Sequence, residues 1–128
     1  MARLVPRFAG ASLAAAALAG TMGCSLVGAD NTEACNKIQT VVQEFTSSSV
    51  KNVDNPAALG ESYHKLADDI RTEGAKGDGD LEDATKDLGA AYDKLGDEVS
   101  KLANDPNPTI PDSGDVNAAG VKFKAACE

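Results

Sequence analysis

The distribution of apolar residues divides the chain into an N-terminal apolar stretch and four amphipathic segments. Residues 8–20 are mostly Ala and Leu, and the first acidic residue is Asp30. Beyond it, apolar residues recur at intervals of three and four, which places them on one face of an α-helix. No segment alternates between apolar and polar residues as a half-buried strand does. The pattern predicts an all-α fold with helices near residues 31–50, 56–74, 80–104 and 113–127.

Helix-end signals support these four segments. Asn55 followed by Pro56 is typical of an N-cap and the first turn of a helix. Asp80 is expected to cap the third helix, and Gly74 to end the second in the left-handed conformation. The segment 105–111 contains three prolines, so it is predicted to be a rigid, non-helical linker.

The apolar faces of the four segments predict the core. The inward positions are Ala34, Ile38, Val41, Val42 and Phe45; Leu59, Tyr63, Leu66 and Ile70; Leu81, Ala84, Leu88, Ala91, Leu95 and Leu102; and Val116, Gly120, Phe123 and Cys127. Many of these side chains are small, and the chain has no Trp. A small domain with such a core is expected to need a covalent constraint.

The N-terminus has the features of an export signal. Arg3 and Arg7 precede the apolar stretch of residues 8–20, and this order is that of a signal peptide. The stretch is shorter than the roughly 20 apolar residues that a membrane span needs. The alternative, that it forms the first helix of the fold, is disfavoured by the sharp change to polar sequence at Asp30.

Residues 21–25 (Thr-Met-Gly-Cys-Ser) resemble a bacterial lipobox, in which a cysteine after a small residue is lipidated and becomes N-terminal. Thr21 and Met22 depart from the usual pattern. We expect a signal peptide over residues 1–23, a lipid on Cys24 and a tether over 24–31. The four-helix domain is then predicted over residues 32–128.

The three cysteines discriminate between possible cleavage sites. Lipidation consumes Cys24, and the alternative cleavage after Ala29 removes it, so both leave Cys35 and Cys127 as a pair. Cleavage after Ala19 would leave an unpaired thiol outside the cytoplasm, where disulfides persist. In an up-down-up-down bundle, the start of the first helix and the end of the fourth lie at the same end. The sequence therefore predicts a Cys35–Cys127 disulfide that closes the bundle.

The charge of the chain excludes some classes of partner. The sequence has twelve Lys and Arg against twenty Asp and Glu, a net charge of −8. Residues 1–23 contain two of the basic residues and none of the acidic ones, so the chain without them would carry −10. A binder of nucleic acid needs a basic face, and anionic lipid head groups would repel this surface. We expect no nucleic-acid partner and a monomeric chain.

The sequence lacks the common catalytic and metal-binding motifs. It has no nucleophile elbow, phosphate-binding loop or zinc-binding His-Glu-x-x-His helix. A calcium loop starting at Asp78 would have Asp83 and Gly89 where glycine and glutamate are required. His64 is the only histidine and is expected to face solvent. These observations predict a protein that is not an enzyme and has no metal or cofactor.

The overall plan resembles the small lipoproteins and secreted helical proteins of actinobacteria. The resemblance is carried by the Ala-rich export signal, residues 23–25 (Gly-Cys-Ser), the early Cys35, and the final Ala-Ala-Cys that ends at Cys127. It implies an extracytoplasmic protein, anchored to the cell membrane by Cys24 or secreted. The expected function is an envelope-anchored interaction or scaffolding module with an unknown envelope partner.

The plan is also similar to that of the mycobacterial haemophore-like proteins, which combine an export signal, a helical bundle and a disulfide between the ends of the domain. This resemblance implies an alternative function, the carriage of haem or another small hydrophobic ligand. The Tyr-Leu-x-x-His-Pro stretch of those proteins is missing here. Tyr63 and His64 are the residues that could bind such a ligand.

Overall fold

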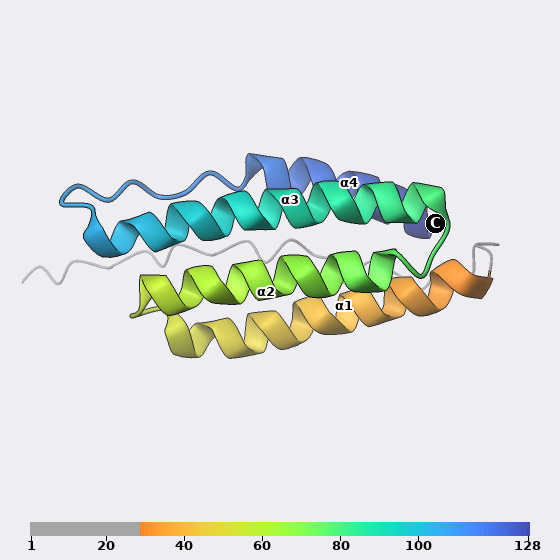
Figure 1. Cartoon of the computed structure of the whole chain (residues 1–128), viewed down its shortest axis with the longest axis horizontal. Helices are drawn as coiled ribbons and strands as arrows, with labels where there is room; N and C mark the ends of the chain where they lie inside the picture. The colour runs from red at the N-terminus through yellow and green to blue at the C-terminus, as the bar shows by residue number, and fades with distance from the viewer. Residues whose placement is uncertain (1–28) are drawn as a thin grey trace, which may run out of the picture.

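The structure is a computed structural model that describes residues 29–128, and this part of the chain is helical and contains no strand. The export signal and Cys24 lie outside the described residues. The helices are α1 (Ala29–Ser49), α2 (Pro56–Gly74), α3 (Gly79–Lys101) and α4 (Gly114–Cys127), with short 3₁₀ segments η1 (Val50–Asn52) and η2 (Leu102–Asn104) after α1 and α3. Figure 1 shows the four helices packed along a common long axis.

The second helix has the bounds that the sequence predicts. The Asn55 side chain accepts a hydrogen bond from the backbone N–H of Ala58 at 3.2 Å, and Pro56 occupies the first turn. This is the geometry by which an N-cap satisfies an otherwise unpaired N–H group. The sequence signal at Asn55 and Pro56 therefore identifies the start of α2 correctly.

Three expectations about single residues are wrong. The cap of α3 is Asp78, not Asp80, because the extended backbone at Asp78 lets its carboxylate accept from the N–H of Leu81 at 2.9 Å. Gly74 keeps a helical backbone rather than the left-handed one, and a Cβ there would collide with the Thr85 side chain. Gly120 does not point into the core: nothing lies within 4 Å of a Cβ built on it, and Ala119 is buried instead.

Helices α2 and α3 form the closest pair in the domain, and they run antiparallel. Gly60 near the start of α2 lies against Gly96 near the end of α3, and Gly74 at the end of α2 lies against Thr85 near the start of α3. Glycine allows two helix backbones to approach closely because no Cβ separates them. We call this contact surface between the two helices the α2–α3 seam.

The core lies between the four helices and is made mostly of aliphatic side chains and alanines. Its buried members are Ala34, Cys35, Ile38, Leu66, Ile70, Leu81, Leu88, Ala91, Ala119 and Phe123. Helix α1 packs on α2, and α4 packs on α3. The predicted disulfide is present: Cys35 near the start of α1 is bonded to Cys127 at the end of α4, with the two Cα atoms 6.0 Å apart.

A polar contact fixes the start of α1 to the turn between α2 and α3. Asn31 is only 4% exposed. Its side-chain amide donates to the Asp78 carboxylate at 2.7 Å and accepts from the Asp78 backbone N–H at 2.8 Å. Hydrogen bonds from the Leu81 N–H and from Asn31 lower the pKa of Asp78. Asn31 thus belongs to the packed domain.

Candidate functional site

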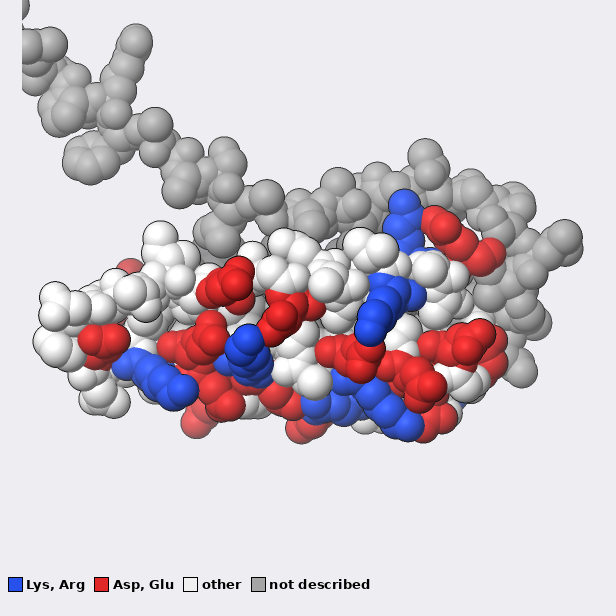
Figure 2. Space-filling view, turned by 90° about the horizontal axis from the view of Figure 1, so that it is seen from above, with Lys and Arg blue, Asp and Glu red and all other residues white. Residues whose placement is uncertain are grey.

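Charged side chains of both signs are mixed over the surface. In Figure 2, acidic and basic side chains lie beside one another on the face shown. Most ion pairs join exposed residues, such as Lys94 with Asp115 and Lys122 with Asp87, which connect α3 to α4. Exposed pairs of this kind contribute roughly 0–1 kcal/mol each. One polar network differs from these pairs because it joins five residues across the α2–α3 seam.

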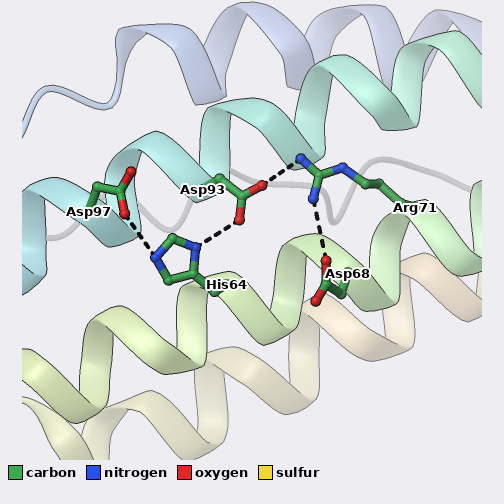
Figure 3. A network of polar contacts seen from close by, with 5 residues as sticks. All are labelled: His64, Asp68, Arg71, Asp93 and Asp97. Carbon is green, nitrogen blue, oxygen red and sulfur yellow. Dashed lines mark hydrogen bonds and ion pairs between the residues drawn. The ribbon is translucent and has the colours of Figure 1, made fainter.

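This network is centred on His64 in α2. Asp93 and Asp97 are four residues apart in α3, so their side chains point to the same side of that helix. Arg71 lies about two turns after His64 on α2, and Asp68 lies between them. Figure 3 shows the two carboxylates of α3 reaching toward the imidazole and the guanidinium of α2.

Both ring nitrogens of His64 face a carboxylate. Nδ1 lies 2.8 Å from Oδ1 of Asp93, and Nε2 lies 3.1 Å from Oδ1 of Asp97. The second oxygen of Asp93 accepts from the Arg71 guanidinium at 2.5 Å, and Arg71 also approaches Asp68 at 3.5 Å. The Asp93 carboxylate is therefore shared between the two cationic groups of α2.

The surroundings of His64 stabilise its charged form. The hydrogen bond to Asp93 is the main cause that raises the pKa of His64, and the negative charges of Asp93 and Asp97 act in the same direction. Partial burial works against them. Only the imidazolium carries an N–H on both nitrogens, so the observed arrangement of two carboxylates fits the protonated ring.

The pKa of Asp93 is subject to opposing effects. Its partial burial would raise the pKa of the carboxyl group, but hydrogen bonds from His64 and Arg71, together with their positive charges, lower it overall. The side chains of His64, Asp93 and Arg71 are 40%, 34% and 33% exposed. The network therefore lies at the edge of the seam, partly in contact with water.

Tyr63 packs inside the domain, as the sequence predicts, whereas His64 does not face open solvent as expected. Tyr63 packs between aromatic rings, with its ring centroid 4.8 Å from that of Phe45 and 6.1 Å from that of Tyr92. Burial raises the pKa of Tyr63 and is also the main cause that raises the pKa of Tyr92. His64 points instead to the charged network and is only partly exposed. The two side chains thus lie in different surroundings.

The described residues include no group of three or more His, Cys, Asp or Glu side chains arranged to hold a metal ion. Both nitrogens of His64 already face carboxylates, so the ring presents no free nitrogen to a ligand in this conformation.

A shallow groove of about 310 Å³ lies between α1 and α2. Its apolar floor is formed by Val41, Phe45 and Leu66, and Lys65 and Asp69 are among the polar residues at its edge. Lys65 and Asp69 form an ion pair at 2.6 Å. The apolar floor of the groove is compatible with a small apolar ligand.

Comparison with known proteins adds no assignment. No protein-family model, curated protein or solved structure matches the chain. Among the described helices, none combines the length and the apolar character that crossing a membrane requires.

Proposed function

We propose that this protein is a non-catalytic extracytoplasmic lipoprotein that acts as an envelope-anchored interaction module. In this proposal residues 1–23 direct export, a lipid on Cys24 holds the protein at the membrane, and the helical domain contacts an envelope protein. The single observation that carries the extracytoplasmic location is the Cys35–Cys127 disulfide.

The disulfide supports export because such bonds persist in oxidising compartments and are rare in the cytosol. It joins residues 92 positions apart, so it closes nearly the whole described domain into one loop. An export signal and a lipobox-like sequence precede this domain in the chain. The structural bond and the N-terminal sequence thus point to the same compartment.

The proposal includes an up-down-up-down course for the four helices. The antiparallel α2–α3 pair supports it, as do the packing of α1 on α2 and of α4 on α3. The disulfide between the start of α1 and the end of α4 is the geometry expected for an even number of alternating helices. The tether would then leave the domain at its disulfide-bonded end.

We favour an interaction module over a catalytic site for two reasons. The polar side chains around His64 bind one another within the domain, and the surface carries charges of both signs. The net charge of −8 disfavours nucleic acid and anionic lipid as partners. A partner protein with a complementary, basic surface fits better. We propose that the domain itself is a monomer.

The anchoring is tested by replacing the lipidated residue. The C24A variant should leave the membrane fraction of the native host, whereas wild type should stay in that fraction after a high-salt wash and require detergent for release. S25A, one residue further along, serves as the matched control and should behave as wild type. Membrane retention of a C24A chain from which residues 1–23 have been removed, or wild-type protein in the cytosol, would contradict the proposal.

The interaction role needs its own test. In vivo cross-linking of wild type in the envelope, followed by purification in detergent, should recover one reproducible protein partner in defined stoichiometry. C24A expressed at the same level is the control, because a protein without the lipid should meet a membrane-located partner less often. If the membrane-anchored protein yields no such partner, the proposed location would stand but the proposed scaffolding role would be rejected.

The groove between α1 and α2 favours a second candidate, the carriage of a small hydrophobic ligand or haem. Val41, Phe45 and Leu66 supply its apolar floor. Tyr63 and His64, the ligating residues that the sequence suggests, are not among its lining residues, and His64 would have to leave Asp93 or Asp97 to bind a ligand. Haem titration should produce a change in visible absorbance, or apolar ligands should raise the melting temperature. Flat absorbance and unchanged melting with both would reject this function.

A further inference from the structure

The protonation state of His64 determines how many contacts join α2 to α3. A neutral imidazole has one N–H and one nitrogen lone pair. It can donate to Asp93 or to Asp97 but not to both. In the neutral ring, a lone pair would face a carboxylate oxygen about 3 Å away, which is repulsive.

The two carboxylates are not equivalent in this respect. Asp93 is closer to the ring, and its other oxygen is held by Arg71. Asp97 has the longer contact to His64 and is 65% exposed. Loss of the proton is therefore expected to leave the Asp93 contacts in place and to break the contact to Asp97.

The packing of the seam determines where the ring can move. A Cβ built on Gly96 would lie 2.9 Å from the carbonyl oxygen of Gly60 and 3.3 Å from Nε2 of His64. The imidazole thus lies close to the bare backbone of α3 at Gly96. Since 40% of its side chain is exposed, the ring can move toward solvent.

Because His64 lies among several charged groups, its change in protonation alters the charge balance of the network. From α3 it is faced by Asp93 and Asp97, and on α2 the network continues to Arg71 and Asp68. When the ring is protonated, its positive charge and that of Arg71 are set against the three carboxylates of this network. When the ring is neutral, only Arg71 offsets those three negative charges, and the repulsion among the carboxylates increases.

From this geometry we infer that His64 is a proton-dependent clasp of the α2–α3 seam. The imidazolium binds both carboxylates of α3 and holds the two helices together. The neutral ring releases Asp97 and loosens the seam at its exposed edge. Mildly acidic surroundings tighten the domain, and mildly alkaline surroundings relax it.

The raised pKa of His64 fixes the direction of the effect on stability. A group with a higher pKa in the folded state stabilises the fold fully below its unfolded-state value, near 6.5. That contribution is lost as the pH rises through the folded-state pKa. Asp93, whose pKa is lowered, acts oppositely and loses its contribution only in strong acid. The clasp is therefore strongest between these two limits.

The direct test is an NMR titration of the purified, disulfide-bonded protein, because His64 is the only histidine in the chain. The pKa should lie above 6.5 in wild type and should fall toward that value in D97N. D69N is the matched control, since Asp69 is on α2 and pairs with Lys65 instead. It should leave the pKa of His64 unchanged. A wild-type pKa at or below 6.5 would overturn the clasp.

A second measurement distinguishes the clasp from a merely structural side chain. The urea midpoint of wild type should fall as the pH rises from about 5.5 to about 8.5. H64Q keeps a polar side chain that does not titrate, so its midpoint should follow a flatter course over the same range. Equal slopes for wild type and H64Q would reject the inference, even if H64Q is less stable at every pH.

Discussion

At the scale of single residues, the absence of a side chain is as important as the contacts that side chains make. Gly60 and Gly96 let the backbones of α2 and α3 approach closely: a Cβ on Gly60 would lie 2.8 Å from the Gly96 carbonyl oxygen, and a Cβ on Gly96 would lie 2.9 Å from the Gly60 carbonyl oxygen. Each glycine costs about 1 kcal/mol relative to alanine in a helix. That cost is offset by the close packing and by the position it gives to His64.

Replacing Gly96 with alanine should destabilise the protein. The added Cβ would lie 2.9 Å from the Gly60 carbonyl oxygen and 3.0 Å from Cβ of Tyr63, so α2 would have to move. Overpacking of this kind costs about 1–3 kcal/mol, which exceeds the gain in helix propensity. The free energy of unfolding from urea denaturation measures the loss.

The matched control is G120A in α4, where nothing lies within 4 Å of the new Cβ. Here only the helix propensity changes, so the variant should be more stable than wild type by about 0.5–1 kcal/mol. The two substitutions are chemically identical and are expected to have opposite signs. If G96A were as stable as G120A, the close approach at the seam would be wrong.

Asn31 makes a second residue-scale contribution, because it joins two parts of the chain 47 residues apart. Asn31→Ala removes two hydrogen bonds, one of them to the charged Asp78, and should cost about 1–3 kcal/mol. N36A, an exposed position on the same helix, should cost much less. Urea denaturation gives both values, and equal stabilities would argue against the contact.

At the scale of the helices, the two N-caps provide a direct comparison. Asn55 caps α2 with a side-chain hydrogen bond, whereas Ser113 precedes α4 and makes no such bond. N55A should therefore destabilise the protein by about 1 kcal/mol. S113A should have an effect near zero. Thermal unfolding followed by circular dichroism can compare them, and a larger loss in S113A would contradict the assignment of the caps.

The sequence predicts the number of helices and much of the core, because apolar spacing records which face of a helix is buried. It does not predict features that depend on the partner of a side chain. Asp93 and Asp97 are visibly four residues apart, but nothing in the chain indicates that His64, about 30 residues earlier, lies between them. The spacing also fails for Gly120 and Ala119, which are neighbours at the edge of the same face.

At the scale of the whole molecule, the disulfide is the main constraint on the fold. Closing a loop of 92 residues stabilises a protein by about 4–5 kcal/mol in the chain-entropy model. A domain of this size has a total stability of roughly 5–15 kcal/mol, and this core is rich in small residues. The bond therefore supplies a large share of the stability.

The C35A/C127A variant should lose most of that contribution. We expect its free energy of unfolding to be about 4 kcal/mol lower than that of wild type, with partial unfolding at 37 °C. Urea denaturation of oxidised wild type, reduced wild type and the variant should place the last two close together. A reduced protein as stable as the oxidised one would show that the helices need no covalent closure.

Lipid anchoring and the disulfide are both tested by the intact mass of the protein from the membrane fraction of its native host, with and without reduction. We expect an acylated chain that begins at Cys24 and gains the mass of two hydrogen atoms when the Cys35–Cys127 bond is reduced. An unlipidated chain that begins at Asp30 and is found in the medium would contradict the anchoring. A chain that retains residues 1–23 with free thiols would contradict export itself.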